Sequence, residues 1–253
     1  MIAIALQSGS SGNCIYVETG GMKLLFDAGI CGIAAERRLA AYGRDIREVS
    51  AVIISHDHSD HARYAGVYQR KYGLPIYITK RTLEAAGKRC CLGRLRDVSF
   101  FRSGDEIGFG SVTVRTLPTP HDGEDGSVFV ISAKAKRLGI MTDLGHVFEG
   151  LADEVASLDA VFIESNYDTE MLKSGPYPAF LKRRIQGPRG HISNLESAEL
   201  LLAGRYLRWA CLSHLSGENN DPAAALRTHR EVLGGSIALY TASRQAPTGI
   251  FRL

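Results

Sequence analysis

One segment of the chain has the residue types and the spacing that suit metal binding. His56-Asp57-His58-Ser59-Asp60-His61 places three imidazoles and carboxylates within six residues, directly after the apolar run at residues 51–54. Histidine nitrogen and carboxylate oxygen are donors that suit zinc and similar ions, and the end of a strand is a rigid mount for them. The alternative is an exposed loop that is rich in histidine, but this spacing seldom arises by chance. The segment therefore predicts a metal site.

The HxHxDH spacing resembles the metal signature of the metallo-β-lactamase superfamily, and further motifs of that family follow in order along the chain. Taken singly, the later residues could each be an ordinary core or turn residue, but their order beside HxHxDH favours ligands. The implied ligands are His56, His58 and His121 for one metal, Asp60, His61 and His214 for the other, and Asp143 as the bridge between them.

The same resemblance implies a chemistry for this site. Two divalent ions, zinc or manganese with iron as a further candidate, would be held by such donors. The pair would make a bridging hydroxide at neutral pH, which Asp60 would help to orient, and would polarise a substrate oxygen. Asp27 would support the metal loop as a hydrogen-bond acceptor outside the ligand set. The expected activity is hydrolysis.

Within the superfamily, three segments resemble the YycJ, WalJ and VicX type of protein, a group similar to 5′-to-3′ DNA exonucleases. They are residues 8–13, residues 164–168, and residues 190–194 together with residues 214–220. The resemblance covers most of the chain and implies nucleic acid, DNA foremost, as the substrate, with Asn166 in the substrate site. Tyr167 stands where a histidine is expected in this group, so no role is assigned to it.

The segment at residues 8–13 offers groups that could bind a phosphate. It combines hydroxyls, an amide and glycine backbone between two predicted strands, and such a segment can form an anion-binding nest from Ser8, Ser10, Ser11 and Asn13. A tight turn with solvated hydroxyls is the alternative.

Positive charges gather just before His191 and include Lys182 and Arg183. If the fold brings them to the metal site, they would bind phosphates beside the scissile bond, whereas a solvated helix face is the alternative. In related phosphodiesterases a histidine placed like His191 donates a proton to the leaving oxygen. The alternative role is a polar residue at a helix start, because Ser193 is a good N-cap.

The elements that position these residues follow from hydrophobic spacing. Strands are predicted at residues 2–6, 14–18, 22–26, 49–54, 76–78, 98–101, 112–117, 127–133, 138–142, 160–164 and 209–213, and helices at residues 31–42, 64–71, 83–88, 194–203 and 222–233. Many strands in both halves, with helices between them, predict an α/β (α+β) fold in which two sheets pack as a sandwich flanked by helices. With the resemblance, this becomes the four-layer αββα metallo-β-lactamase sandwich, and residues 1–253 are expected to form a single domain.

Composition narrows the class of protein. The net charge of +3 is only mildly basic and does not by itself indicate a nucleic-acid binder. Five cysteines without a CxxC pair argue against a disulfide framework and a zinc ribbon. Neither a signal peptide nor a segment of transmembrane length is evident, so a cytoplasmic protein without membrane contact is expected. His146 and His229 lie outside any motif and are expected at the surface.

These observations favour a binuclear metal-dependent phosphodiesterase, with a DNA exonuclease as the leading hypothesis. A small-molecule hydrolase acting on a cyclic phosphate, thioester, lactone or lactam would use the same metals. A regulatory protein that binds metal without catalysis is a third reading. Only about seventy residues separate Asp143 from His214, which leaves no room for the large cap domain of a ribonuclease J-like enzyme.

Overall fold

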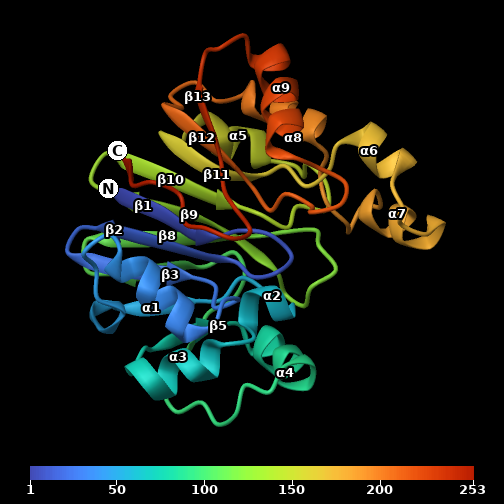
Figure 1. Cartoon of the computed structure of the whole chain (residues 1–253). Helices are drawn as coiled ribbons and strands as arrows, with labels where there is room; N and C mark the ends of the chain where they lie inside the picture. Colours follow the sequence, from blue (N-terminus) through green and yellow to red (C-terminus); the bar gives the residue numbers. More distant parts are fainter.

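The computed structural model describes all residues from Met1 to Leu253, which form two mixed β-sheets that pack face to face (Figure 1). The first sheet has the spatial order β14 (Phe251–Arg252), β1 (Ile2–Gln7), β2 (Cys14–Thr19), β3 (Met22–Phe26), β4 (Ala51–Ile53), β5 (Ile76–Ile78) and β6 (Val98–Phe100). The second has the order β13 (Ala238–Thr241), β12 (Trp209–Ser213), β11 (Ala160–Glu164), β10 (Lys136–Met141), β9 (Ser127–Ala133), β8 (Val112–Pro118) and β7 (Glu106–Phe109).

Both sheets change from antiparallel to parallel pairing partway across. In the first sheet β14 to β3 are antiparallel neighbours and β3 to β6 are parallel. In the second, β7 to β10 are antiparallel and β10 to β13 are parallel. Parallel neighbours require a connection that crosses back over the sheet, and these connections carry the helices.

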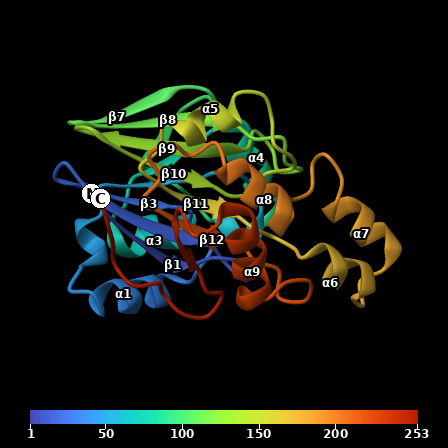
Figure 2. The same ribbon diagram turned by 90° about the horizontal axis from the view of Figure 1, so that it is seen from above.

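Helices cover the outer face of each sheet, so the molecule has four layers (Figure 1). The first sheet is covered by α1 (Gly32–Ala40), α3 (Ala65–Tyr72) and α4 (Lys80–Arg89), with the 3₁₀ turn η1 (Ile46–Glu48) between α1 and β4. The second is covered by α5 (Leu151–Ala156), α8 (Asn194–Leu201) and α9 (Pro222–Leu233). The short α2 (Ser59–Ala62) follows β4, and α6 (Thr169–Ser174) and α7 (Ala179–Ile185) project to one side of the sandwich (Figure 2). The predicted αββα sandwich is confirmed.

Central strands are buried on both faces, which explains their nearly continuous apolar sequences. In β2, Ile15 and Val17 point into the core between the sheets, whereas Cys14 and Tyr16 point into the core beneath the helices. The same alternation divides β11 between the inter-sheet core and the core under α5, α8 and α9. The five cysteines are free thiols, and no helix is both long and apolar enough to cross a bilayer.

The structure also contains elements that the sequence pattern did not predict: β7, β13, β14, α2, α5, α6 and α7, and the turn η1. One prediction about a side chain was wrong. His229 is fully buried, because its side chain lies in the stripe of α9 that contains Ala225 and Leu233 and packs onto the second sheet. Its two ring nitrogens lie 2.8 Å from the Ala225 carbonyl oxygen and 3.1 Å from Ser197 Oγ. His146 is exposed, as expected.

Candidate metal centre

All of the predicted ligands except His121 lie where parallel strands end, at one edge of the sandwich. In the first sheet, Asp27 follows β3 and residues 56–61 follow β4. In the second, Asp143 follows β10, Glu164 is the last residue of β11, and His214 follows β12. Ligand sites in sheets of this kind form outside the carboxyl ends of the parallel strands. Residues from the first and second halves of the chain therefore meet at one edge of the molecule.

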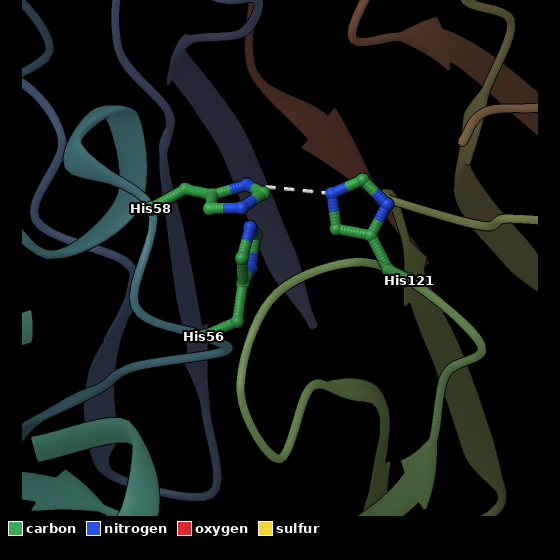
Figure 3. A group of neighbouring side chains, drawn as sticks. All are labelled: His56, His58 and His121. Carbon is green, nitrogen blue, oxygen red and sulfur yellow. Dashed lines mark hydrogen bonds between the residues drawn. The ribbon is translucent and has the colours of Figure 1, made fainter. Parts of the chain in front are cut away.

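His56, His58 and His121 form the first group of converging side chains (Figure 3). His121 Nε2 lies 3.4 Å from His58 Nδ1, and a donor atom of each of the three residues lies within 4.8 Å of the others. His56 and His58 come from the loop after β4, whereas His121 comes from the loop between β8 and β9. The group therefore joins the two sheets.

Asp60, His61 and His214 form the second group, and Asp143 lies between the two groups. Asp60 Oδ2 lies 3.6 Å from Nε2 of both His61 and His214. Asp143 Oδ2 lies 3.3 Å from His61 Nε2, and its Oδ1 lies 3.5 Å from His121 Nε2. One carboxylate thus approaches imidazoles of both groups.

Each histidine of the two groups has a partner on the ring nitrogen that faces outward. His61 Nδ1 is 2.8 Å from Asp27 Oδ2, and the same carboxylate accepts hydrogen bonds from the Ser55 backbone N–H and hydroxyl. The other outward pairs are His56 Nδ1 with Ser55 Oγ (2.9 Å), His58 Nε2 with Asp122 Oδ1 (3.3 Å), His121 Nδ1 with the Gly190 carbonyl oxygen (2.8 Å), and His214 Nδ1 with Glu164 Oε1 (2.9 Å). Such partners fix the ring orientation and the tautomer of metal-binding histidines.

The inward donor atoms fit divalent metal ions. His56 Nε2, Asp143 Oδ2 and His214 Nε2 are buried and lack a hydrogen-bond partner. A buried polar atom without a partner is costly, and a bound cation would satisfy all three. Five imidazoles and two carboxylates are a donor set that suits zinc, manganese or iron. The residues present therefore fit the metal pair that the sequence suggests.

The charges of the two groups differ in the absence of metal. Burial lowers the pKa of His56 well below its usual value, and burial likewise lowers the pKa of His58 and His121. Burial would also lower the pKa of His61, but the Asp143, Asp27 and Asp60 carboxylates outweigh it and raise that pKa to about 9. The first group therefore presents neutral imidazoles, the form that binds metal, whereas the second must release protons when a metal binds.

The buried Glu164 is a part of the centre to which the sequence assigned no role. Its Oε1 accepts from Nδ1 of both His191 (2.8 Å) and His214 (2.9 Å), and its Oε2 accepts from the Leu144 backbone N–H (2.8 Å). Burial would raise the pKa of this carboxyl, but His191 and His214 outweigh it and lower the pKa to about 2. Its place as the last residue of β11, between two parallel strands that carry ligands, is the signal that could have revealed it.

His191 lies at the mouth of the centre. It lines a hollow of about 230 Å³ together with His58, Asp60, Asp143 and His214. Because Glu164 holds its Nδ1, the Nε2 atom is left for another partner. The next residues begin α8, where Ser193 is the N-cap and forms a reciprocal capping box with Glu196. His191 therefore lies both at the mouth of the centre and just before the start of a helix, so the two roles considered for it are compatible.

The predicted phosphate-binding segment at residues 8–13 contacts the centre only in part. Asn13 Nδ2 lies 2.9 Å from His61 Nε2 and donates to Asp60 Oδ2 at 3.3 Å, and Ser8 Oγ accepts from the His214 backbone N–H at 2.9 Å. These two buried side chains support ligands. Ser10 is exposed at the mouth, whereas Ser11 accepts a hydrogen bond from Gln7.

The predicted substrate contacts in the second half are also divided. Asn166 lines the mouth and donates through Nδ2 to the His214 carbonyl oxygen at 2.9 Å. Lys182 instead donates to the carbonyl oxygens of residues 173 and 175, and Arg183 is exposed on α7 outside the hollow. Arg184, the next residue, does line it. Tyr167 is buried and pairs with Ser193 in an isolated β-bridge outside the hollow.

Comparison with known proteins decides the family. A model described as the metallo-beta-lactamase superfamily matches residues 8–203. The chain belongs to this superfamily. Two curated members are 36% identical to the chain: exodeoxyribonuclease WalJ of Streptococcus pneumoniae over 85% of this chain and 81% of its own, and exodeoxyribonuclease YycJ of Bacillus anthracis over 90% and 87%. Among solved structures, the metallo-beta-lactamase fold protein YhfI of Bacillus subtilis covers the whole of both chains with a TM-score of 0.76 at 17% identity, which shows the shared fold.

Proposed function

We propose that this member of the metallo-β-lactamase superfamily is a metal-dependent phosphodiesterase that degrades DNA as an exonuclease. The observation that carries the proposal is the convergence of seven donor side chains, of which the five imidazoles each have a partner on the outward ring nitrogen, in a chain that matches two named exodeoxyribonucleases over most of its length. Such a centre suits hydrolysis of a phosphodiester, and the relatives' names supply the substrate.

The proposed metal ligands follow the two groups in the structure. His56, His58 and His121 would hold one ion and Asp60, His61 and His214 the other, with Asp143, which lies near imidazoles of both groups, as a ligand that they would share. A divalent pair in this place supplies a nucleophile from water at neutral pH and withdraws charge from the phosphoryl oxygen. Zinc, manganese and iron all suit the donors.

Residues of the chain complete the proposed reaction. Asp60, which is partly exposed at the mouth, accepts a hydrogen bond from the attacking water and so fixes its orientation. His191 donates a proton from Nε2 to the leaving oxygen, while Glu164 keeps the ring in place through Nδ1. A histidine suits this task because its ordinary pKa lies near neutrality.

The test is direct. Purified protein loaded separately with zinc, manganese or magnesium is mixed with end-labelled single-stranded DNA, duplex DNA and RNA, and His58→Ala serves as the matched inactive control. The proposal predicts metal-dependent loss of terminal nucleotides from linear DNA, and closed circular DNA should survive. If every nucleic acid stays intact with each metal, the substrate proposal is wrong. Cleavage of circular DNA would contradict exonuclease action alone.

A further inference from the structure

A hollow beside the mouth of the centre is lined by three arginines. Arg63, Arg89 and Arg184 surround it together with His58 and Asp60. His58, Asp60 and Arg184 also line the mouth, so the two hollows adjoin. The arginines come from the end of α2, from α4 and from α7.

Two of these arginines are oriented by acidic residues of the metal loops. Arg184 donates to Asp122 Oδ2 through Nε (2.7 Å) and Nη2 (2.6 Å), while Asp122 Oδ1 faces His58. Arg89 forms an ion pair through Nε with the fully buried carboxylate of Asp57. A guanidinium held in this way keeps further N–H donors for a phosphate. Arg63 has no ion-pair partner and is exposed.

Two further hollows continue from this one along α4. The next shares Arg89 and adds Arg81 and Lys88, and the one beyond it shares Arg81 and adds Lys80 and Phe100. Phe100 is 50% exposed, and Lys80 Nζ lies 5.7 Å from the centre of its ring. The two outer hollows also contain carboxylates, those of Glu84, Glu124, Asp105 and Asp125. Positive charge is therefore most concentrated in the hollow beside the metal centre.

We infer that these hollows form one basic track that binds the phosphates of a single DNA strand leading away from the metal centre, with Phe100 stacking on a base at its outer end. This inference rests on the proposed function and names where the substrate lies. Arginine and lysine along a groove bind phosphates without regard to sequence, and exposed aromatic rings bind unpaired bases. The track runs from the metal centre along α4 and does not include Lys182 or Arg183, the positions that the sequence suggested.

The decisive variant is the double charge reversal Arg81→Glu/Lys88→Glu. Steady-state kinetics of the metal-loaded enzyme on a 20-nucleotide single strand should show KM raised at least about tenfold with little change in kcat, since the track binds the strand away from the reacting atoms. The salt dependence should also weaken, by about 0.7 in the log–log slope for each lost phosphate contact.

Arg227→Glu/Arg230→Glu is the matched control, because it makes the same charge change on the exposed face of α9. Thermal unfolding and metal content of both double variants should equal those of the wild type. An equal rise in KM for both would reveal a general charge effect and overturn the track, as would an unchanged KM for the α4 variant. If the wild type cuts no DNA, the proposed function fails separately, and the track is then tested by fluorescence anisotropy with the same uncut strand.

Phe100→Ala tests the outer end of the track. KM for the single strand should rise about fivefold, and Phe100→Tyr should restore it because the ring is retained. Binding of blunt duplex DNA should not change with either variant. An equal loss for duplex and single strand would contradict base stacking, and no loss for either would remove Phe100 from the track.

Discussion

The two sheets contribute to the centre in different ways. The first sheet supplies four ligands from six consecutive residues after one strand, with Asp27 holding one of their rings. The second supplies single residues from separate loops, and Glu164 holds two rings that are far apart in the sequence. A local cluster needs only a turn to form, whereas the dispersed half forms only when the parallel strands pair. The comparison predicts that both sets of ligands are equally necessary for activity. It also predicts that the carboxylates that hold the ligand rings, Asp27 in the first half and Glu164 in the second, have different roles.

The largest effect should come from removing one ligand in each half. We expect His58→Ala and His214→Ala each to lower kcat by at least about 10³-fold, more than the roughly 10–100-fold cost of losing an outer hydrogen-bond partner. Bound metal, measured by mass spectrometry of the elements, should fall below that of the wild type. Arg230→Ala on α9 is the control. Retained activity in only one of the two ligand variants would break the equivalence of the halves.

His191→Ala should give the next largest effect and act on chemistry rather than on metal. Loss of a proton donor lowers kcat by about 10²–10⁴-fold, and KM for DNA should change little. Metal content should match the wild type. If the variant instead loses metal as His214→Ala does, His191 is a ligand and the proposed proton transfer is wrong.

Replacing the carboxylates that hold the ligand rings, Asp27 and Glu164, should have smaller effects on activity than removing a ligand or His191. Asp27→Asn and Glu164→Gln should each weaken metal affinity by roughly 10–100-fold, as measured by competition with a chelating dye. At saturating metal, Asp27→Asn should recover most activity, whereas Glu164→Gln should remain slower because Glu164 also orients His191. Equal recovery of activity by both variants would show that Glu164 is not needed to orient His191.

The smallest effect on activity should come from His229, a histidine of the second half that lies outside the centre. Burial lowers its pKa to about 4, partly offset by the hydrogen bond to the Ala225 carbonyl oxygen. The unfolded chain, with a histidine pKa of about 6.5, therefore binds the proton first, so folding stability falls as pH decreases from about 6.5 to about 4. The loss attributable to His229 is about 3 kcal/mol.

Urea unfolding of His229→Gln and of the wild type across this range measures that loss. The variant should lack it, so its unfolding free energy should decline less steeply with acid. His146→Gln, which changes an exposed histidine, should follow the wild type. The same chelator in every sample removes metal from all three proteins, so differences between them isolate the side chain. Parallel curves for His229→Gln and the wild type would contradict the assignment.

The sequence predicts the first half of the centre better than the second for a physical reason. Residues 56–61 are neighbours in the chain, so their chemistry is visible without a fold. His121, Asp143 and His214 are recognisable only by their order, and Glu164 has meaning only once β11 lies between the two strands that precede Asp143 and His214. The role of the centre as a binuclear site, a single domain over residues 1–253 and a cytoplasmic location stay predictions.

Helical geometry explains why the residue of the basic run that lines the mouth differs from the two that the sequence suggested. On α7, Leu181, Arg184 and Ile185 line the mouth because residues three and four apart share one face of a helix. Lys182 and Arg183 therefore point elsewhere. The long strands were predicted well because they are buried on both faces, whereas β14 has two residues and α5 to α7 have six or seven. Elements this short give too little periodicity to detect.

The pairing of β14 with β1 joins segments about 250 residues apart and determines how the first sheet ends. Ile2 pairs with Arg252, and Phe251 packs against Trp209 and Tyr240 of the second sheet. All other strands of the first sheet lie within residues 2–100, so that sheet can assemble early while the edge of β1 stays open. An open strand edge is a template for pairing between molecules. In the folded protein the last residues cover this edge, so shortening the chain before Phe251 should make it prone to self-association.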